Sequence, residues 1–489
     1  MLYVSSLISD LFQEIMTTRI LAFFVLVFVL TGCQDNMNLS EQPMGDDADL
    51  TLFFVNDQHG RINNFSKVQA IVEEAKANGN ALLVSAGDIF SGNPIVDQYT
   101  EPGFPMIDIM NQTGFDVGVL GNHEFDFGTD VLEARIQESQ FPWVLANLED
   151  NQSVGNQVDP YVTLSVGGLR VTFLGLVETN GKQGATIPST HPLRVASLNF
   201  QRYQDVMNEY ADLKTRENAD VLVALTHLGS GTDRTLARTY PYFDLIIGGH
   251  SHEMIEEEIN DIPLVQAGSN LRFLGRIDLK IENKKVTNYS VDMINLNAVA
   301  TPESALAENI EAYNDDPSFS TVVGEAATAH AFGEVGCFYT TALQEYMEVD
   351  FTIQNSGGIR AGIDQGPITR MEVFTMDPFN NQSVAFTKTV GAFESFFCET
   401  GARFYFTGIH VSEADGDFQI VDADGIPLPD DQQLTMGVND YIPAVFDNYF
   451  DFSDADIRPY TTAEAIIGYL QNINSNINFE DCFRTLDCD

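Results

Sequence analysis

Basic residues are scarce in this sequence. It has 24 lysines and arginines against 71 aspartates and glutamates, which gives a net charge of −47 at pH 7. Such a charge repels the phosphate backbone of nucleic acids and anionic membrane surfaces, so we expect no nucleic acid partner. The apolar fraction of 44% and the aromatic fraction of 11% still allow large cores, which excludes a disordered chain. Nothing in the composition sets an oligomeric state.

Apolar runs long enough to span a membrane are also missing. The run at residues 20–30, ILAFFVLVFVL, is too short to cross a bilayer and suits the core of a signal peptide. It ends in Leu30-Thr31-Gly32-Cys33, which resembles the lipobox of bacterial lipoproteins. The resemblance implies a signal peptide over residues 1–32, export, and a lipid anchor at Cys33. Gln34 then favours the outer membrane, with the chain facing the periplasm or the cell surface. An ordinary signal peptide with a chance cysteine is the alternative.

Only five cysteines are present, and none has the spacing of a zinc site. Four of them remain besides Cys33, and an even number in an exported protein suggests two disulfides. The short separation favours a bond between Cys482 and Cys488, which leaves Cys337 to pair with Cys398. Free buried thiols are the alternative.

The 489 residues are enough for two or three domains. Residues 33–48 are polar and acidic and are typical of a tether. Over residues 49–299, short apolar strands alternate with helical or loop stretches, which predicts an α/β domain. Residues 300–320 are polar with helical character and predict a linking helix. The pattern then restarts over residues 321–489 and predicts a second, smaller α/β domain.

Five apolar runs of the first domain each end in possible metal ligands. Each run is short and continuous, as expected for a strand that is buried on both faces. The runs and the residues that follow them are 50–55 with Asn56-Asp57-Gln58-His59, 81–86 with Gly87-Asp88, 116–120 with Gly121-Asn122-His123-Glu124-Phe125-Asp126, 220–225 with Thr226-His227, and 244–247 with Gly248-Gly249-His250-Ser251-His252. Five of the eight histidines lie in these strand ends. Active sites of layered α/β folds gather at the carboxyl edge of the strands, so we expect these side chains to meet.

This set contains more oxygen and nitrogen ligands than one transition metal ion takes. It suits two ions that share a bridging carboxylate, about 3.5–4 Å apart. Carboxylate and imidazole ligands without thiolate favour Zn, Mn, Fe or Co. With one residue between them on a tight turn, His250 and His252 can each face a different ion. A loop with two surface histidines is the alternative for this pair alone.

The motifs D-x-H, G-D, G-N-H-E, T-H and G-H-x-H, in this order, are similar to those of calcineurin-type metallophosphoesterases. The stretch GNHEFD at residues 121–126 resembles the 5′-nucleotidase and UDP-sugar hydrolase family in particular. The resemblance implies a four-layer αββα sandwich. It also implies one ion bound by Asp57, His59 and His252, a second bound by Asn122, His227 and His250, and Asp88 as the bridge.

The resemblance gives His123 a different role from the ligands. His123 would face the substrate as general acid toward the leaving oxygen, and Asp126 would hold its imidazole protonated. An imidazolium beside a carboxylate can supply such a proton near neutral pH. Glu124 is either a supporting residue behind the ligands or a solvated side chain. The other histidines, His191, His330 and His410, match no motif and are predicted to be structural or exposed.

Two stretches of the second domain resemble the 5′-nucleotidase C-terminal domain. The first, QNSGGIR at 354–360, resembles the motif NGGGIR with Ser356 in place of one glycine. Its Asn355 and Arg360 would bind substrate, because a Gly-Gly turn exposes N–H groups and a guanidinium can fork onto a phosphate or ribose. A turn with a surface arginine is the alternative. The second, residues 368–382, resembles a stretch that ends in PFGN, with Asn380 in place of glycine.

The resemblance also implies two aromatic side chains that stack on a nucleobase. Phe404 or Phe406 is the first candidate and Tyr441 is the second. Asp447 keeps the position of the aspartate in a family GGDG turn, but Ala444-Val445-Phe446 replace the rest of that motif. The lost glycines weaken the expectation of a turn there. Core positions are the alternative for these aromatic residues.

Together these features predict an exported, two-metal phosphoester hydrolase. Its substrates would be nucleoside 5′-monophosphates, and UDP-sugars or 2′,3′-cyclic nucleotides are further candidates. A surface lipoprotein that binds without turnover is one alternative, suggested by the altered turn before Asp447. A thiosulfate-type hydrolase of the same architecture is a second.

Overall fold

The structure is a computed structural model that describes residues 47–149, 154, 157–400, 403–414, 417–473, 475–480 and 483–485. The predicted signal peptide, Cys33, nearly all of the predicted tether, Cys482 and Cys488 lie outside the described residues. Apart from Asp47, the described residues belong to one compact unit, Ala48–Asp489. None of the helices within these ranges is long and apolar enough to cross a membrane.

The first sheet of the N-terminal part has the strand order β12-β11-β1-β2-β3-β4. Its strands are β1 (Asp47–Val55), β2 (Ala81–Ser85), β3 (Val117–Val119), β4 (Trp143–Val144), β11 (Phe273–Glu282) and β12 (Lys285–Asn295). Strands β1 to β4 run parallel, and β11 and β12 pair in the antiparallel sense. Every residue of β2 is buried, as its continuous apolar run predicts.

The second sheet has the order β5-β6-β7-β8-β10-β9. Its strands are β5 (Tyr161–Val166), β6 (Leu169–Val177), β7 (Val221–His227), β8 (Leu245–Ile247), β9 (Met254–Ile259) and β10 (Ile262–Ala267). Strands β6, β7, β8 and β10 run parallel. All of β7 is buried, which fits a strand covered on both faces.

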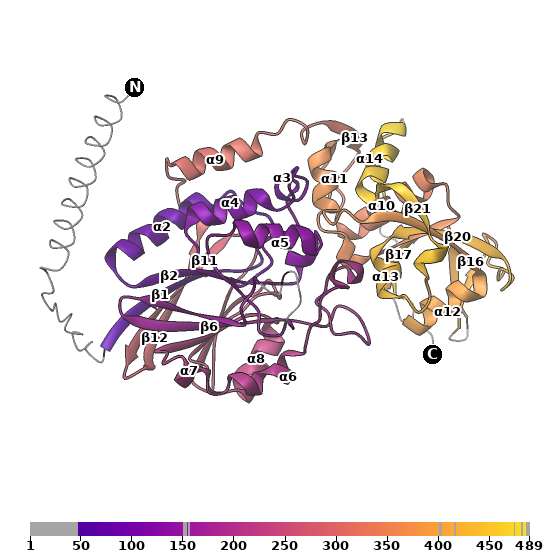
Figure 1. Ribbon diagram of the computed structural model, residues 1–489. Helices are drawn as coiled ribbons and strands as arrows, with labels where there is room; N and C mark the ends of the chain where they lie inside the picture. Colours follow the sequence, from indigo (N-terminus) through magenta and orange to yellow (C-terminus); the bar gives the residue numbers. More distant parts are fainter. Residues whose placement is uncertain are drawn as a thin grey trace, which may run out of the picture. The chain divides into compact units, whose positions relative to one another are not determined.

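Helices cover the outer faces of both sheets (Figure 1). The first sheet is covered by α2 (Phe65–Asn78), α4 (Phe104–Thr113) and α5 (Thr129–Glu138), and the second by α6 (Tyr203–Val206), α7 (Leu213–Arg216) and α8 (Ser230–Thr239). The second group contributes Tyr203, Val206, Leu213 and Leu236 to a core with the sheet residues Leu174, Leu222 and Leu264. The arrangement therefore has four layers, and the predicted α/β fold class is confirmed.

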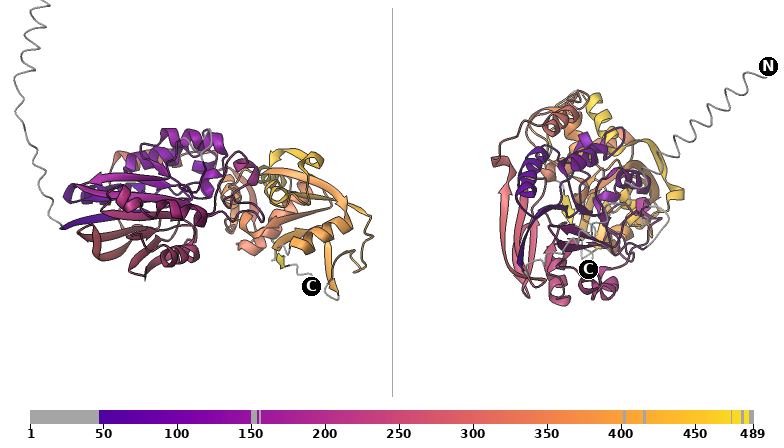
Figure 2. Two further views of the ribbon diagram at one scale, coloured as in Figure 1. Left: turned by 60° about the horizontal axis from the view of Figure 1, so that its bottom comes forward. Right: turned by 60° about the vertical axis from the view of Figure 1, so that its left-hand side comes forward.

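The C-terminal part, coloured orange to yellow in Figure 2, follows helix α9 (Ala305–Asn314), which lies within the predicted linking segment. Its main sheet has the order β21 (Asp456–Thr461), β16 (Gln382–Thr389), β20 (Gln433–Asn439), β14 (Phe351–Asn355), β17 (Arg403–Thr407) and β22 (Phe483–Thr485). Its helices are α10 (Phe332–Met347), α11 (Arg370–Met376), α12 (Val390–Thr400), α13 (Tyr441–Val445) and α14 (Thr462–Asn472). Two small sheets pair β13 (Val322–Ala326) with β15 (Gly366–Thr369), and β18 (His410–Ala414) with β19 (Asp417–Val421).

Cys337 in α10 and Cys398 in α12 are each disulfide-bonded. The alternative of free thiols is therefore excluded for these two residues. Because Cys482 and Cys488 lie outside the described residues, the predicted pairing of the four cysteines stays a prediction.

Candidate metal centre and catalytic site

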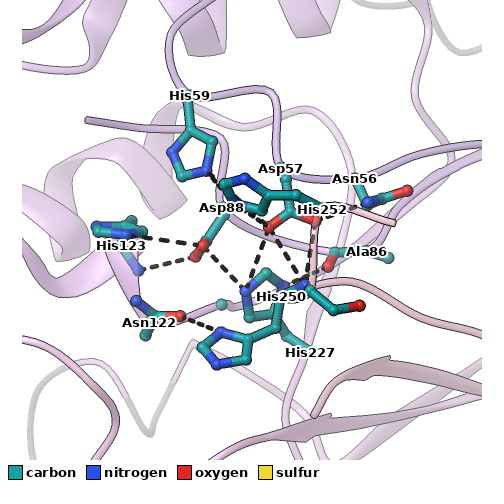
Figure 3. A network of polar contacts seen from close by, with 12 residues as sticks. Asn56, Asp57, His59, Ala86, Asp88, Asn122, His123, His227, His250 and His252 are labelled. Carbon is teal, nitrogen blue, oxygen red and sulfur yellow. Dashed lines mark hydrogen bonds and ion pairs between the residues drawn. The ribbon is translucent and has the colours of Figure 1, made fainter. Parts of the chain in front are cut away.

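The fold brings all seven predicted metal ligands into one network of polar contacts (Figure 3). The strands β1, β2 and β3 of the first sheet and β7 and β8 of the second each deliver ligands just after, or at, their carboxyl ends. Three groups in this network have ligand atoms within 4.8 Å of one another: Asp57, His59 and His252; His59, Asp88 and His123; and Asp88, His227 and His250. Asp88 therefore lies close to His59 on one side and to His227 and His250 on the other, as a bridging carboxylate must.

One half of the network consists of Asp57, His59 and His252. The Nε2 atoms of His59 and His252 lie 2.9 Å apart, and Nε2 of His252 lies 3.3 Å from Oδ1 of Asp57. The Nδ1–H of His59 donates to the carbonyl of Ser91 at 3.0 Å, which leaves its Nε2 for the centre. Two imidazole nitrogens and a carboxylate thus converge on one point, as a divalent cation requires.

The other half contains His227, His250 and Asn122, together with Asp88. Nε2 of His227 lies 3.0 Å from Oδ2 of Asp88, and its Nδ1–H donates to the carbonyl of Ala86 at 2.7 Å. Nδ1 of His250 lies 3.0 Å from Oδ1 of Asn122. This donor set fits a second divalent cation, with Zn, Mn, Fe and Co as the ions that such ligands favour.

The backbone is strained at the ligands. Five of them have positive φ angles: Asp57 (50°), His59 (48°), Asp88 (56°), His250 (78°) and His252 (56°). Non-glycine residues rarely adopt this region, and such strain clusters at functional sites. A Cβ on Gly249 would lie 2.5 Å from the carbonyl oxygen of Ala86, so the close approach of these two loops needs glycine.

Glu124 supports the loops that carry the ligands. Its side chain is buried and accepts hydrogen bonds from the backbone N–H groups of Gly121 (2.5 Å), Asp88 (3.1 Å) and Ile89 (2.6 Å). Burial and the neighbouring charge of Asp88 raise the pKa of Glu124 to about 7. Of the two predicted roles for Glu124, the structure excludes the solvated side chain.

The charges of the network act on its histidines in opposite directions. Burial, together with the charge of His123, lowers the pKa of His59 to about 3. Burial also opposes protonation of His227, but the Asp88 carboxylate outweighs it and raises the pKa of His227 to about 10. A cation would therefore meet a neutral His59 and would replace a proton on His227, as metal binding to imidazole generally does.

His123 and Asp126 form a close pair beside the ligands. Nδ1 of His123 lies 2.5 Å from Oδ2 of Asp126, and the other oxygen of this carboxylate accepts from the hydroxyl of Thr190 at 2.8 Å. Burial opposes protonation of His123, yet the Asp126 and Asp88 carboxylates raise its pKa. Burial opposes ionisation of Asp126, yet the His123 imidazole lowers its pKa. The pair is thus set up as imidazolium and carboxylate, with Nε2 of His123 directed toward the ligand network, 4.0 Å from Oδ2 of Asp88.

A cleft of about 430 Å³ opens at this pair and is lined by both parts of the chain. Its lining includes His123, Asp126, His191, Arg194, His250 and His252 from the N-terminal part, and Asn355, Arg360, Phe379, Asn381 and Tyr441 from the C-terminal part. The ring of Phe379 stacks on His123 with a centroid distance of 5.9 Å, and the guanidinium of Arg360 lies 5.7 Å from the Phe379 centroid. The cleft therefore offers a proton donor, a cation and aromatic faces next to the ligand network.

Comparison with known protein families agrees with this arrangement. The profile of the calcineurin-like phosphoesterases matches residues 50–254, and that of the 5′-nucleotidase C-terminal domain matches residues 319–452. The chain belongs to the 5′-nucleotidase family. Members of this family are metallophosphoesterases, and they use divalent metal ions.

Individual relatives of this 5′-nucleotidase family chain are distant. The 5′-nucleotidase of Vibrio cholerae is 26% identical over 497 residues, which covers 83% of this chain and 86% of the relative. The endonuclease YhcR of Bacillus subtilis is 26% identical over 68% of this chain, but the match spans only 31% of that relative. The crystal structure of a 5′-nucleotidase precursor from Thermus thermophilus has a TM-score of 0.76 at 21% identity and covers 88% of this chain and 98% of its own, which shows a shared fold.

Not every residue predicted to bind substrate lines the cleft of this family member. Asn355, Arg360 and Tyr441 do line it. Phe404 and Phe406 lie instead in the aromatic core of the C-terminal part, where they pack on Phe397. The reason is strand alternation: Phe404 and Phe406 are two residues apart on β17, so both rings project from the same face of the sheet into this core.

The segment after Tyr441 does not form the family's glycine turn, in agreement with the doubt that the lost glycines cast on it. Residues 441–445 form helix α13, and the carbonyl of Ala444 accepts a hydrogen bond from Lys182. The exposed Asp447 forms an ion pair of 2.7 Å with the same lysine and does not line the cleft. The loss of the glycines allows a helical turn in place of the family's GGDG loop.

Three residues that line the cleft were not predicted as site residues from the sequence. Phe379 lay in a recognised stretch but was not singled out. His191 was predicted to be structural or exposed, yet it lines the cleft, with Nε2 3.4 Å from Oδ1 of Asp440. Arg194 donates to the carbonyl of Asp126 and to that of Phe379 (2.9 Å). Neither His191 nor Arg194 follows a strand end, so the pattern that revealed the ligands could not reveal them.

Proposed function

We propose that this chain is a two-metal hydrolase that releases phosphate from nucleoside 5′-monophosphates. The observation that carries the proposal is the position of His123, which lies between the metal-ligand network and the aromatic wall of the cleft, with Nδ1 held by Asp126. A binding protein would need the ligands but would have no use for this proton donor. The similarity to a 5′-nucleotidase along most of both chains supports the same substrate class.

The metal ligands and the acid pair divide the chemistry between them. Two divalent cations held by Asp57, Asp88 and their neighbours would supply Lewis acidity toward the phosphate and would activate water. His123 orients its Nε2–H toward the oxygen of the leaving nucleoside and gives it a proton as the ester bond breaks. Asp126 keeps the imidazole in the required tautomer and favours its protonated form.

The cleft provides the contacts that hold the nucleotide. Arg360 donates to phosphate oxygens, because its guanidinium makes no hydrogen bond to a described residue and only overlies Phe379. The rings of Phe379 and Tyr441 offer faces for the base. The Oδ1 atom of Asn355 is buried and has no hydrogen-bond partner among the described residues, so it can accept from a ribose hydroxyl or a base N–H. UDP-sugars and 2′,3′-cyclic nucleotides carry the same recognition elements and are further candidate substrates.

Phosphate release by the soluble fragment from residue 34 onward tests this function. AMP, UMP, UDP-glucose, 2′,3′-cyclic AMP and bis-p-nitrophenyl phosphate would be offered with Mn, Zn or Co. We expect the highest kcat/KM for a nucleoside monophosphate. Turnover of the generic diester alone would show a working metal centre that serves another substrate, and would overturn the assignment to nucleotides.

We further propose that the protein is an exported lipoprotein anchored at Cys33, with the outer membrane as its site. The short apolar run before Leu30-Thr31-Gly32-Cys33 supports this location. Labelling of the expressed protein with a radioactive fatty acid tests it. The label and the membrane fractionation should both be lost in Cys33→Ser, and their retention in that variant would exclude an anchor at this residue.

A further inference from the structure

Arg194 contacts the backbone of both parts of the chain. Its Nη1–H donates to the main-chain carbonyl of Asp126, and its Nη2–H donates to the main-chain carbonyl of Phe379 at 2.9 Å. Nη2 also lies 3.4 Å from the carbonyl oxygen of Asn380 and 3.4 Å from Oδ1 of Asn381. All four acceptors are neutral, although the chain has 71 acidic residues. The planar fork of a guanidinium allows one side chain to hold two backbone segments at a fixed separation.

The short segment that carries Arg194 also holds the carboxylate of the acid pair. The hydroxyl of Thr190 donates to Oδ1 of Asp126 at 2.8 Å, while Oδ2 of this carboxylate lies 2.5 Å from Nδ1 of His123. Residues Pro192–Val195 form a 3-10 helical turn, which sets the spacing between Thr190 and Arg194. One segment therefore holds Asp126 both at its side chain and at its backbone.

The ring of Phe379 contacts two side chains of the catalytic cleft. It stacks on the imidazole of His123, with 5.9 Å between the ring centroids and 20° between the ring planes. The guanidinium of Arg360 lies 5.7 Å from the Phe379 centroid. Cations are attracted to an aromatic face within about 6 Å, so the ring helps to hold both side chains in place. The orientation of the general acid therefore depends on where Phe379 is held.

A second contact fixes the loop of Phe379 to the N-terminal part. Nε2 of Gln98 donates to Oδ1 of Asn380 at 2.8 Å. Asn380 stands where the family stretch PFGN has glycine, and it has a positive φ of 51°. A glycine would suit this backbone better, but it would have no side chain to accept from Gln98. Together with the contacts of Arg194, this bond holds three successive residues, 379–381, to the N-terminal part.

We propose that Arg194 is a positioning residue, which holds the ring of Phe379 on the imidazole of His123 so that Nε2 of this general acid meets the leaving oxygen. This inference deepens the proposed function and rests on it. Arg194 itself transfers no proton. The proton moves from Nε2 of His123 to the leaving oxygen as the phosphorus–oxygen bond breaks, and the oxygen of the attacking water stays on the phosphate. Without Arg194 the ring and the imidazole could turn, and a misplacement of about 1 Å can cost about a hundred-fold in rate.

Two aryl phosphates separate this role from a purely structural one. Phenolate is a poor leaving group that needs a proton, whereas p-nitrophenolate is stable without one near neutral pH. We expect Arg194→Gln to lower kcat about ten-fold for phenyl phosphate, and by less than about two-fold for p-nitrophenyl phosphate. Phe379→Leu, which replaces the flat ring by an aliphatic side chain, should shift the ratio of the two kcat values in the same direction. Arg238→Gln, at an exposed arginine in the last turn of α8, is the control and should leave the ratio unchanged.

The ratio of the two kcat values is insensitive to partial unfolding, because an inactive fraction lowers both rates equally. Equal losses for the two esters in Arg194→Gln, no loss in that variant, or an unchanged ratio in Phe379→Leu would overturn the proposal. So would the same shift in Arg238→Gln, or a loss of bound metal in Arg194→Gln by plasma mass spectrometry, which would place its effect on the ligand network.

The same substrates distinguish a failure of this inference from a failure of the proposed function. If the wild-type protein hydrolyses AMP and Arg194→Gln loses nothing, the positioning role fails and the proposed function stands. If the wild-type protein hydrolyses both aryl phosphates but not AMP, the assignment to nucleotides fails, and the ratio in Arg194→Gln still decides the positioning role. If it hydrolyses none of these esters, both fail.

Discussion

The hydroxyl of Ser91 donates a hydrogen bond of 2.6 Å to Oδ2 of Asp126, the same oxygen that lies 2.5 Å from Nδ1 of His123. The backbone carbonyl of Ser91 accepts at the same time from Nδ1–H of His59, a predicted metal ligand, at 3.0 Å. Ser91 has a positive φ of 62°, a conformation that orients both groups. Ser91, in the loop that follows β2, thus links the acid pair to the metal-ligand network. The proton donor and the ligands are therefore positioned together.

Replacement of His123 by alanine should remove catalysis without removing metal. General acid catalysis contributes about a hundred- to ten-thousand-fold, so kcat for AMP should fall by about that factor. The metal content, measured by plasma mass spectrometry, should stay unchanged because the predicted ligands are intact. His410→Ala, at an exposed histidine of β18, is the control and should retain full activity. An unchanged kcat in His123→Ala would show that His123 is not the general acid.

Replacement of Asp126 by asparagine should change the pH dependence of kcat. The Asp126 carboxylate raises the pKa of His123, and a general acid works only while it is protonated. Activity therefore falls as the pH rises through this pKa. Without the carboxylate the pKa falls, so the alkaline limb of the profile should move to lower pH, and kcat should drop by at least about ten-fold. A pH profile parallel to that of the wild-type protein would show that Asp126 does not act through His123.

The sequence was sufficient to predict the features that depend on residue patterns within short segments of the chain. Continuous apolar runs predicted strands buried on both faces, and the structure has β2 and β7 as such strands. Ligand-type residues at the ends of these runs were expected to meet, and the fold does place Nε2 of His227 3.9 Å from Oδ1 of Asp57 and 3.0 Å from Oδ2 of Asp88. This worked because parallel strands place their carboxyl ends at one edge, so position along a strand translates directly into position in space.

The features that depend on packing between distant segments could not be predicted. Phe404 and Tyr441 are both aromatic, but only the packing of layers on β17 decides that Phe404 is buried, whereas Tyr441 at the start of α13 lines the cleft. Arg194 donates hydrogen bonds to the backbone carbonyls of Asp126 and Phe379. Every residue has a backbone carbonyl, so the sequence does not show which carbonyls will accept from a side chain. The same holds for the cavity lined by His59, Arg61 and Phe332, which arises where residues near 60 and near 332 meet.

Replacement of Glu124 by alanine should destabilise the protein. Its carboxylate accepts from three buried backbone N–H groups, and an unsatisfied buried donor costs about 1–3 kcal/mol. Allowing for partial rearrangement, we expect the free energy of unfolding to fall by about 2–4 kcal/mol, measured by urea denaturation. Glu73→Ala at an exposed position of α2 is the control and should change little. A change in Glu124→Ala as small as that of the control would mean that the loops re-form without it.

Removal of divalent metal should abolish activity and lower the melting temperature. A ligand that binds only the folded state stabilises it by mass action, and the network places carboxylates close together that need a cation. Dialysis against EDTA followed by calorimetry should therefore show a lower Tm. Both properties should return when Mn, Zn or Co is added, and the order of rescue would identify the preferred ion. Activity that persists after the metal content has fallen to background would exclude metal-dependent catalysis.

The salt dependence of kcat/KM should reflect two opposing electrostatic effects: repulsion of the substrate by the whole chain and attraction by the cleft. The net charge of −47 repels an anionic nucleotide at long range, whereas Arg360 and the metal ions attract it at close range. Salt screens the long-range part first, because the Debye length is about 10 Å at 0.1 M. We expect kcat/KM for AMP to rise several-fold between about 10 mM and 150 mM KCl, with kcat nearly constant, since only the encounter is affected. Melting curves in the same buffers separate this effect from salt-induced stabilisation. A flat or falling profile would mean that the local field of the cleft already dominates at the distance where substrate is captured.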